Sequence, residues 1–282
     1  MTQLSVIPDD NGRAGRYAMC VEYNGSGYHG WQTQQPGVRS VQETLEKALS
    51  KVANEPVTVM CSGRTDTGVH ASSQIVHFDS KAVRSSKAWV FGCNTNLPDS
   101  IAVRWAVPVV PDFHARYSAT SRRYRYVIYN QRVRPALMSD QMTWFDRPLD
   151  EGCMHEAVQY LLGENDFSSF RAAGCQSNTP WRNIERAKVF RMGSLVILEI
   201  QANAFLHHMI RNIVGALLPV GAGDKPVEWI AELLALRDRT QAGVTAPPNG
   251  LYFVEAQYPE HFGLPKLELG PHFLTLLGSE NI

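Results

Sequence analysis

The residues best able to do chemistry lie in a short loop at residues 63–70, with the sequence Gly-Arg-Thr-Asp-Thr-Gly-Val-His. Asp66 is the acid of this loop, and Arg64 stands two positions before it. A cationic neighbour favours the ionised form of a carboxyl group, and an ionised carboxylate is suited to act as a nucleophile rather than as a general acid. The loop therefore marks Asp66 as a candidate nucleophile.

The same loop also has a simpler structural interpretation. Asp side chains often accept hydrogen bonds from backbone amides in turns, and a glycine such as Gly68 supplies a positive φ. On physical grounds alone, Asp66 is a candidate catalytic residue, and an ordinary Asx-turn stays open beside it.

The chain is predicted to contain two runs of elements in the same order, and this loop lies in the first run. Alternating or helical apolar spacing predicts strands at 16–23, 57–62, 73–79 and 101–107, with helices after Ser40 and at 87–93. Ser40 and Glu43 have the spacing of a capping box. The second run has strands at 122–129, 183–190, 195–202 and 251–258, and helices at 149–162, 205–220 and 227–236. Two successive β-α-β-β-α-β units predict an α+β fold of two tandem ferredoxin-like domains.

The expected domain boundary falls where Pro108 and Pro111 flank a short apolar run. The N-terminal domain is expected at residues 16–111, with the Asp66 loop, and the C-terminal domain at 112–262. The ends, 1–15 and 263–282, are expected to be flexible or irregular.

Composition limits the class of protein. Hydrophobic residues make up 44% of the 282 residues, which supports a sizeable core, and 27 basic residues balance 27 acidic ones. Five scattered cysteines without a Cys-x-x-Cys pair argue against a disulfide framework or a thiolate zinc site. With neither a signal-peptide stretch nor about eighteen consecutive apolar residues, the chain is expected to be cytoplasmic and to have no membrane span.

A basic run follows the expected domain boundary. Counting from Asp112, residues 112–134 hold six arginines and one acidic residue. The arginines are Arg116, Arg122, Arg123, Arg125, Arg132 and Arg134. Such a run is either a solvated strand face or, with its interleaved tyrosines, a surface for phosphates and bases. Both interpretations stay open at this point.

Two patterns that suggest a cofactor are rejected. His207 and His208 are adjacent on an expected helix, so their side chains point about 100° apart and are poorly suited to share a metal. Gly25-x-Gly27-x-x-Gly30 follows a strand, but no helix is expected to open at Gly30, as a dinucleotide fingerprint requires. We therefore expect neither a metal nor a cofactor.

The chain resembles a known family. Residues 63–70 match the catalytic-loop motif of pseudouridine synthases, most closely that of the TruA family of tRNA pseudouridine synthases. The resemblance runs from about Tyr17 to about Tyr258. It also includes residues 21–25, 28–32, 39–43, 113–117, 122–126, 205–211 and 250–252. Each segment is short, but their number and order make the match specific.

The resemblance implies roles for individual residues. Asp66 attacks the target uridine, Arg64 helps to hold the base out of its stack, and Tyr124 contacts the flipped uracil. Arg211 pairs with Asp66, and Leu251 forms a wall of the pocket. The two domains would form a mixed, mainly antiparallel sheet, with the active site in the cleft between them.

The resemblance also implies a partner. The substrate is the anticodon stem-loop of tRNA, at positions 38, 39 and 40, and the enzyme is a cofactor-free homodimer. The expected tRNA-contacting residues are Arg84, Phe113, His114, Ala115, Arg116, Tyr117, Arg132, Phe145, Gly174, Cys175, Gln176, Ser177 and Asn178.

Two other classes of protein are weaker alternatives. A non-catalytic RNA-binding protein would not need the Asp66 side chain, and the strands lack an RNP1-like aromatic consensus. A hydrolase of nucleosides would typically pair two carboxylates across the bond, but the loop of Asp66 holds no second acid.

Overall fold

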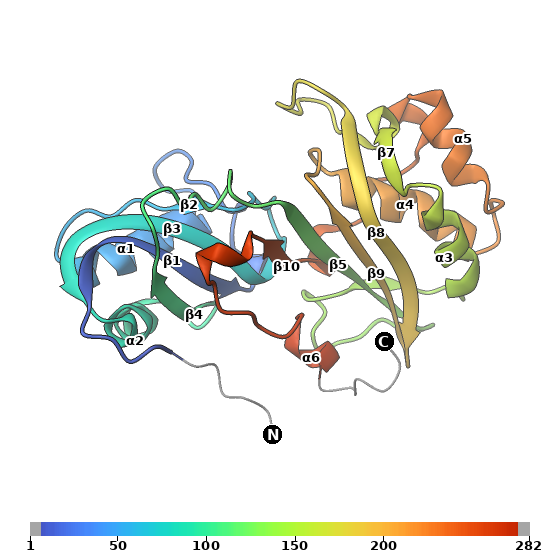
Figure 1. Cartoon of the computed structure of the whole chain (residues 1–282). Coiled ribbons are helices and arrows are strands. Elements are labelled where there is room, and N and C mark those ends of the chain that lie inside the picture. The colour runs from blue at the N-terminus through green and yellow to red at the C-terminus, as the bar shows by residue number, and fades with distance from the viewer. Residues whose placement is uncertain (1–6, 276–282) are drawn as a thin grey trace. The chain divides into compact units, whose positions relative to one another are not determined.

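The computed structural model describes residues 7–275, and the chain divides into two units (Figure 1). Unit 2 is Ser121–Leu251, and unit 1 combines the chain up to Thr120 with the chain from Tyr252 onward. This division differs from the expected domains, 16–111 and 112–262, because residues 112–120 and the chain from Tyr252 onward belong to unit 1. Among residues 7–275, no helix has the length and apolar character needed to cross a membrane.

Unit 1 is a split β-α-β arrangement. Its elements are β1 (Arg13–Tyr23), α1 (Val41–Ala53), β2 (Met60–Cys61), β3 (His70–Arg84), α2 (Ser86–Asn96) and β4 (Ile101–Pro108). In its sheet, β1 lies between β4 and β3, β2 pairs with β3, and all these pairs are antiparallel. β10 (Leu251–Gln257) adds a parallel strand to β3.

Both faces of the unit 1 sheet are covered. On one face, Trp89 of α2 packs edge-on against Tyr17 of β1 and Phe78 of β3, at ring-centroid distances of 5.6 and 5.0 Å. On the other, Tyr258 and Phe262 pack against a core cluster that contains Trp105. The chain after β10 therefore completes the core of unit 1.

Local sequence signals explain the first helix. Ser40 accepts a hydrogen bond from the Glu43 N–H at 3.3 Å, as the capping signal predicts, while the Glu43 carboxylate pairs with Lys47 at 2.5 Å. Asn54 ends the helix in the left-handed region, at φ 56°. The buried residues of α1 recur at helical spacing from Val41 to Ala53.

Unit 2 repeats the arrangement with additions. Its elements are β5 (Ser121–Asn130), β6 (Thr143–Phe145), α3 (Glu151–Gln159), β7 (Gly163–Asp166), β8 (Trp181–Met192), β9 (Leu195–Ala202), α4 (Met209–Gly221) and α5 (Trp229–Leu236). The antiparallel order is β5-β9-β8-β7, and β6 runs parallel to β5. The three helices of this unit, α3, α4 and α5, contact one another, and their labels in Figure 1 lie close together. The expected α+β fold of two tandem ferredoxin-like arrangements is confirmed.

Several elements differ from the sequence-based prediction. β3 is longer than the expected 73–79, and α4 begins at Met209 rather than at residue 205, because His208 adopts a left-handed φ of 58°. The short strands β6 and β7 were not predicted, and neither was α6 (His272–Thr275). Of the ends expected to be flexible or irregular, 263–275 reaches the core, since Leu274 of α6 is buried. Residues 1–6 and 276–282 lie outside the described residues.

Candidate active site

The loop of Asp66 connects β2 to β3 and is held through its backbone. The Trp31 N–H donates to the Thr65 carbonyl at 3.0 Å, and the Gly68 N–H donates to the Tyr28 carbonyl at 3.4 Å. These bonds flank Asp66 on both sides. Its side chain is half-buried and that of Arg64 is exposed. These bonds therefore fix the backbone on both sides of Asp66.

Two glycines allow this backbone contact. A Cβ at Gly25 would overlap the Val69 carbonyl oxygen, and a Cβ at Gly30 would lie 2.7 Å from the Thr65 carbonyl oxygen. Gly30 also has a φ of 84°, which side chains rarely tolerate. The glycine pattern that resembles a dinucleotide fingerprint thus serves the Asp66 loop. After the 3-10 turn Gly25–Gly27, the next helix begins only at Val41, in agreement with the rejection of that fingerprint.

Buried polar side chains complete the support of the loop. The Gln74 amide donates to the Gly63 carbonyl at 2.5 Å and accepts from the Ser62 hydroxyl at 2.6 Å. The hydroxyls of Tyr23 and Thr65 are 2.8 Å apart. Ser62 and Gln74 escaped the sequence analysis, since a polar residue in a strand usually faces solvent. Their one sequence signal is proximity to the Asp66 loop.

A second group links the loop to β10. His70, the first residue of β3, accepts the Gly25 N–H through Nδ1 at 3.0 Å. Its ring stacks on Tyr252 with centroids 4.8 Å apart. One histidine thus ties residue 25 to the strand that completes unit 1.

Cys61 is the other nucleophilic side chain near this loop. Burial raises the pKa of its thiol to about 12, against the opposing charges of Arg64 and Arg116. The thiol is therefore neutral at physiological pH and does not compete with a carboxylate as the nucleophile.

Unit 2 contains the other three residues expected at the catalytic centre. Tyr124 of β5 is 8% exposed and packs edge-on against Phe205, with centroids 5.1 Å apart. Arg211 lies in the first turn of α4, and its Nε donates to the Ala246 carbonyl at 2.7 Å. Leu251 is buried at the start of β10. Asp66 and Arg64 belong to unit 1, and the pairing of Asp66 with Arg211 stays a prediction.

The basic run of residues 112–134 separates into two kinds of arginine. Arg125 is buried and pairs with Glu199 of β9 at 2.7 Å, and Arg123 donates to the Gln201 side-chain oxygen at 2.8 and 2.5 Å. Arg116, Arg132 and Arg134 are exposed. Part of the run therefore joins strands rather than forming either a solvated face or a phosphate-binding surface.

The expected RNA-contacting segment 113–117 alternates between core and surface. Phe113 and Ala115 are fully buried, and the Phe113 ring contacts Tyr258 at 5.2 Å. Arg116 and Tyr117 are exposed, Tyr117 at 76%. The buried members hold the segment, so the prediction of direct side-chain contacts with RNA now applies to its exposed members.

The side chains of two histidines and one arginine form hydrogen bonds with the backbone of this segment. The His77 Nδ1 accepts the Ala115 N–H at 3.1 Å, and the His114 Nδ1 accepts the N–H groups of Arg116 and Tyr117 at 3.1 and 3.2 Å. The Arg16 guanidinium donates to the carbonyls at residues 111 and 113 and pairs with an aspartate at residue 79. Hydrogen bonds to its main chain therefore fix the conformation of this segment.

The remaining expected RNA contacts lie apart from this segment in the sequence. The Arg84 Nε donates to the Val52 carbonyl at 3.0 Å, Arg132 is exposed, and Phe145 is half-buried on β6. In the loop of Gly174, Cys175, Gln176, Ser177 and Asn178, Arg171 donates to the carbonyls of Cys175 and Ser177, at 3.0 and 2.6 Å. Burial by itself would raise the pKa of the Cys175 thiol, but hydrogen bonds from its neighbours lower that pKa below its ordinary value.

The expected helical placement of His207 and His208 is wrong. Both precede α4, and the left-handed His208 brings the two rings to a centroid distance of 3.9 Å. The 100° separation on a helix therefore does not describe this pair.

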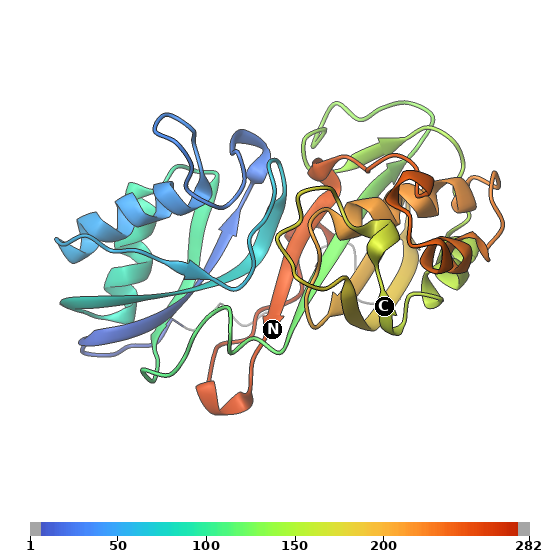
Figure 2. The ribbon, with the colours of Figure 1, turned by 90° about the horizontal axis from the view of Figure 1, so that it is seen from above.

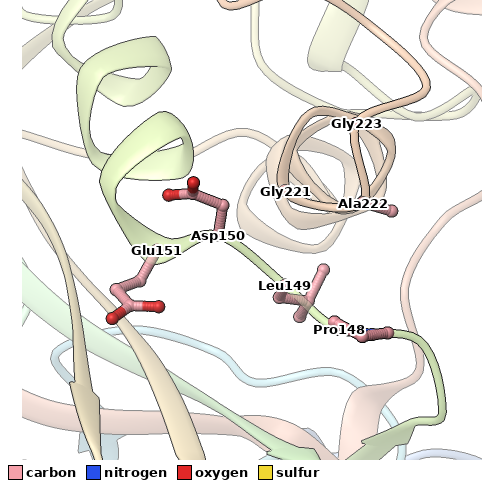
Figure 3. A pocket seen from close by; sticks show the side chains of 7 residues that line it. All are labelled: Pro148, Leu149, Asp150, Glu151, Gly221, Ala222 and Gly223. Carbon is pink, nitrogen blue, oxygen red and sulfur yellow. The ribbon is translucent and has the colours of Figure 1, made fainter.

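A hollow of about 530 Å³ in unit 2 is not lined by any of the expected site residues (Figure 3). It is lined by Pro148, Leu149, Asp150, Glu151, Gly221, Ala222 and Gly223. Both acids already serve the fold: Asp150 caps α3 through the Cys153 N–H, and Glu151 pairs with Arg191 at 2.9 Å. We assign this hollow no role in the chemistry.

Sequence comparison identifies the class of protein. A model of the family described as tRNA pseudouridine synthase matches residues 19–118 and 157–259. These ranges cover more than half of the chain, which therefore belongs to the tRNA pseudouridine synthase family.

Curated relatives narrow the class further, to proteins named tRNA pseudouridine synthase A. The relative from Klebsiella pneumoniae subsp. pneumoniae is 60% identical over 260 residues, which are 92% of this chain and 96% of that protein. The Histophilus somni relative is 61% identical over 259 residues, with the same coverages. The Shewanella loihica relative is 59% identical over 259 residues, 92% of this chain and 99% of that protein. The TruA resemblance is confirmed, and the protein is an enzyme of the isomerase class.

The close backbone approach at Gly30 leads to a first prediction. We expect Gly30→Ala to lower kcat at least about tenfold, because the new Cβ displaces the Thr65 carbonyl and with it Asp66. Gly37→Ala is the matched control: Gly37 has a similar φ of 90°, but its Cβ would meet no atom within 4 Å. Single-turnover pseudouridine formation measures the effect. Equal losses in the two variants would show that backbone strain, and not displacement of the loop, is responsible.

The neutral His77 ring predicts a pH-dependent stability. Burial, followed by the charges of His114 and Arg16, lowers the pKa of His77 from 6.5 to about 4, against the opposing charge of Asp79. The unfolded chain therefore binds a proton at a higher pH than the folded protein does. The free energy of unfolding should be highest above pH 6.5 and should fall by about 2–3 kcal/mol towards pH 4.

Urea denaturation across this pH range checks the prediction. His77→Asn keeps a hydrogen-bond acceptor without a titrating ring, so its free energy of unfolding should fall less steeply below pH 6.5. The same slope in both proteins would contradict the assignment to His77.

Proposed function

We propose that this enzyme converts uridine to pseudouridine at positions 38, 39 and 40 of the tRNA anticodon stem-loop, with Asp66 as the nucleophile. The observation that carries the proposal is the Asp66 loop, whose backbone is bonded on both sides of the carboxylate. Such bonding keeps a reactive group in one position without help from the substrate. The names of the relatives support tRNA as the substrate.

The reaction needs no external group. The bond from N1 of uracil to C1′ of the sugar breaks, the base turns, and a bond from C5 to C1′ forms, while the proton of C5 is replaced by one on N1. No electrons are gained or lost overall. A covalent adduct with the Asp66 carboxylate would divide this exchange into two smaller steps. We therefore propose that the enzyme works without a metal or a cofactor.

The other site residues serve base flipping and positioning. A uridine within a stem must leave its stack before C1′ and C5 can be reached. In the proposed complex, Arg64 holds the base out, Tyr124 contacts the flipped uracil and Leu251 walls the pocket. Arg211 pairs with the Asp66 carboxylate and so holds it in place.

Exposed basic and aromatic side chains would bind the RNA. Arg116 and Tyr117 are exposed, with the half-buried His114 beside them, on a segment whose buried members, Phe113 and Ala115, hold it in place. The wider proposed surface adds the exposed Arg132, together with Arg84, Phe145 and the loop at residues 174–178. We further propose a cytoplasmic homodimer in which both subunits contribute to the RNA-binding cleft.

Incubation with unmodified tRNA tests the whole proposal. Chemical mapping should detect pseudouridine in the anticodon arm with the purified protein, and the yield should be unchanged in EDTA. Asp66→Asn should bind tRNA equally well but lose at least about a thousandfold in rate, as expected on loss of a nucleophile. Turnover by Asp66→Asn would reject the nucleophile, release of free uracil would indicate a hydrolase, and tight binding without product would indicate a binding protein.

The salt dependence of binding tests the RNA surface. Arg116→Ala should weaken tRNA binding and lower the slope of log K against log salt by about one, as loss of one phosphate contact does. Lys47→Ala is the control, since it removes the same charge from the exposed face of α1. If both variants have the slope of the unaltered protein, Arg116 does not contact a phosphate.

A further inference from the structure

Residues 239–250, here called the strap, run from α5 to β10 and lie against α4. Gly215 of α4 marks the closest approach, because a Cβ there would overlap the Val244 carbonyl oxygen. Glycine inside a helix is less stable than alanine, because it has more backbone freedom to lose on folding. The sequence carries this cost at the point where the strap lies on the helix.

The strap forms hydrogen bonds with both the backbone and the side chain of Arg211. The Ala246 N–H donates to the Arg211 carbonyl at 3.1 Å, and the Arg211 Nε donates to the Ala246 carbonyl at 2.7 Å. Because the guanidinium is planar, a bond at Nε sets the plane in which its other N–H groups lie. The position of one strap residue therefore sets the direction of the Arg211 side chain.

A closed triangle of hydrogen bonds fixes that strap residue. Asn212, fully buried beside Arg211 in the sequence, accepts at Oδ1 from Arg239 at 2.9 Å and from the Thr245 hydroxyl at 2.7 Å. Arg239 also donates to the Thr245 hydroxyl at 2.8 Å. The Asn212 amide donates to the Phe170 carbonyl at 2.8 Å, which fixes the triangle to the body of unit 2.

The end of the strap is held as firmly as its beginning. The Tyr126 hydroxyl donates to the Pro247 carbonyl at 2.8 Å, and the Asn249 amide donates to the Met142 carbonyl at 2.7 Å. Gly250 passes so close to the Val127 carbonyl oxygen that a Cβ would lie 2.7 Å from it. Bonds therefore flank Ala246 on both sides along the strap.

We propose that Asn212, Arg239 and Thr245 are positioning residues of the reaction, which act by holding the Ala246 carbonyl so that Arg211 keeps one orientation. The inference rests on the proposed role of Arg211 as the partner of Asp66. A long arginine side chain samples many rotamers, and a displacement of about 1 Å at a reacting group can lower a rate a hundredfold. The triangle removes that freedom.

Thr245 gives the sharpest test, because its hydroxyl alone can be removed. Thr245→Val keeps the shape of the side chain and breaks two sides of the triangle, so kcat in single turnover should fall about tenfold. Thr245→Ser keeps the hydroxyl and should stay within about twofold of the unaltered rate, and the Kd for tRNA should not change in either variant. Thr240→Val is the matched control, since the Thr240 hydroxyl bonds locally, to its neighbours Asp238 and Gln241. An unaltered kcat in Thr245→Val would overturn the inference, and so would equal losses in the valine and serine variants.

A double-mutant cycle separates positioning from general stability. If the triangle acts through Arg211, Thr245→Val should have little further effect on kcat in an Arg211→Lys background. The same fold-loss in both backgrounds would overturn the inference. An impaired Arg211→Lys beside a normal Thr245→Val would reject the positioning role alone. A fully active Arg211→Lys would reject the proposed role of Arg211 and the inference with it, whereas only turnover by Asp66→Asn would reject the nucleophile.

Discussion

The contact between residues 25–31 and the loop of Asp66 is the constraint on which the rest of unit 1 depends. At its centre, the Trp31 N–H bonds to the Thr65 carbonyl. The same segment also starts the first helix, because the Val41 N–H donates to the Gly30 carbonyl at 3.2 Å and the Gln42 N–H donates to the Trp31 carbonyl at 2.9 Å. A single stretch of backbone thus links the Asp66 loop, the N-terminus of α1 and the sheet. Side chains larger than hydrogen at residues 25 and 30 would separate them.

The sequence indicates most of the elements and the loop proposed to hold the nucleophile, but little of what supports that loop. Strands with alternating apolar residues and the capped helix after Ser40 were predicted to within a few residues. The short polar strand β7, Gly163–Asp166, was missed because it has no apolar alternation. The predicted start of α4 was too early. The apolar residues that continue into the helix begin at Phe205, but the left-handed backbone of His208, which depends on tertiary context, delays the helix until Met209.

Supporting residues were missed for a different reason: their partners are distant in the chain. Gln74 supports Gly63, and Glu199 neutralises Arg125, which is 74 positions away. A sequence pattern shows each of these residues without its partner, and an arginine within a basic run then resembles a surface charge. The structure shows that Arg125 belongs to the core, where loss of one partner of a buried pair costs several kcal/mol (about 3–5). The basic character of residues 112–134 is thus only partly available to a nucleic acid.

The return of the chain to unit 1 has a consequence for its synthesis. Figure 2 shows the orange-red strand β10, and Tyr252, at its start, stacks on His70 at the end of the Asp66 loop. Unit 1 is interrupted after Thr120 and resumes at Tyr252, 132 positions later. At translation rates of about 5–20 residues per second, the ribosome needs roughly 7–26 s to cover that gap. The part of the protein that begins first is therefore completed last, and a nascent chain stopped within unit 2 has made the Asp66 loop but not yet the strand against which its histidine packs.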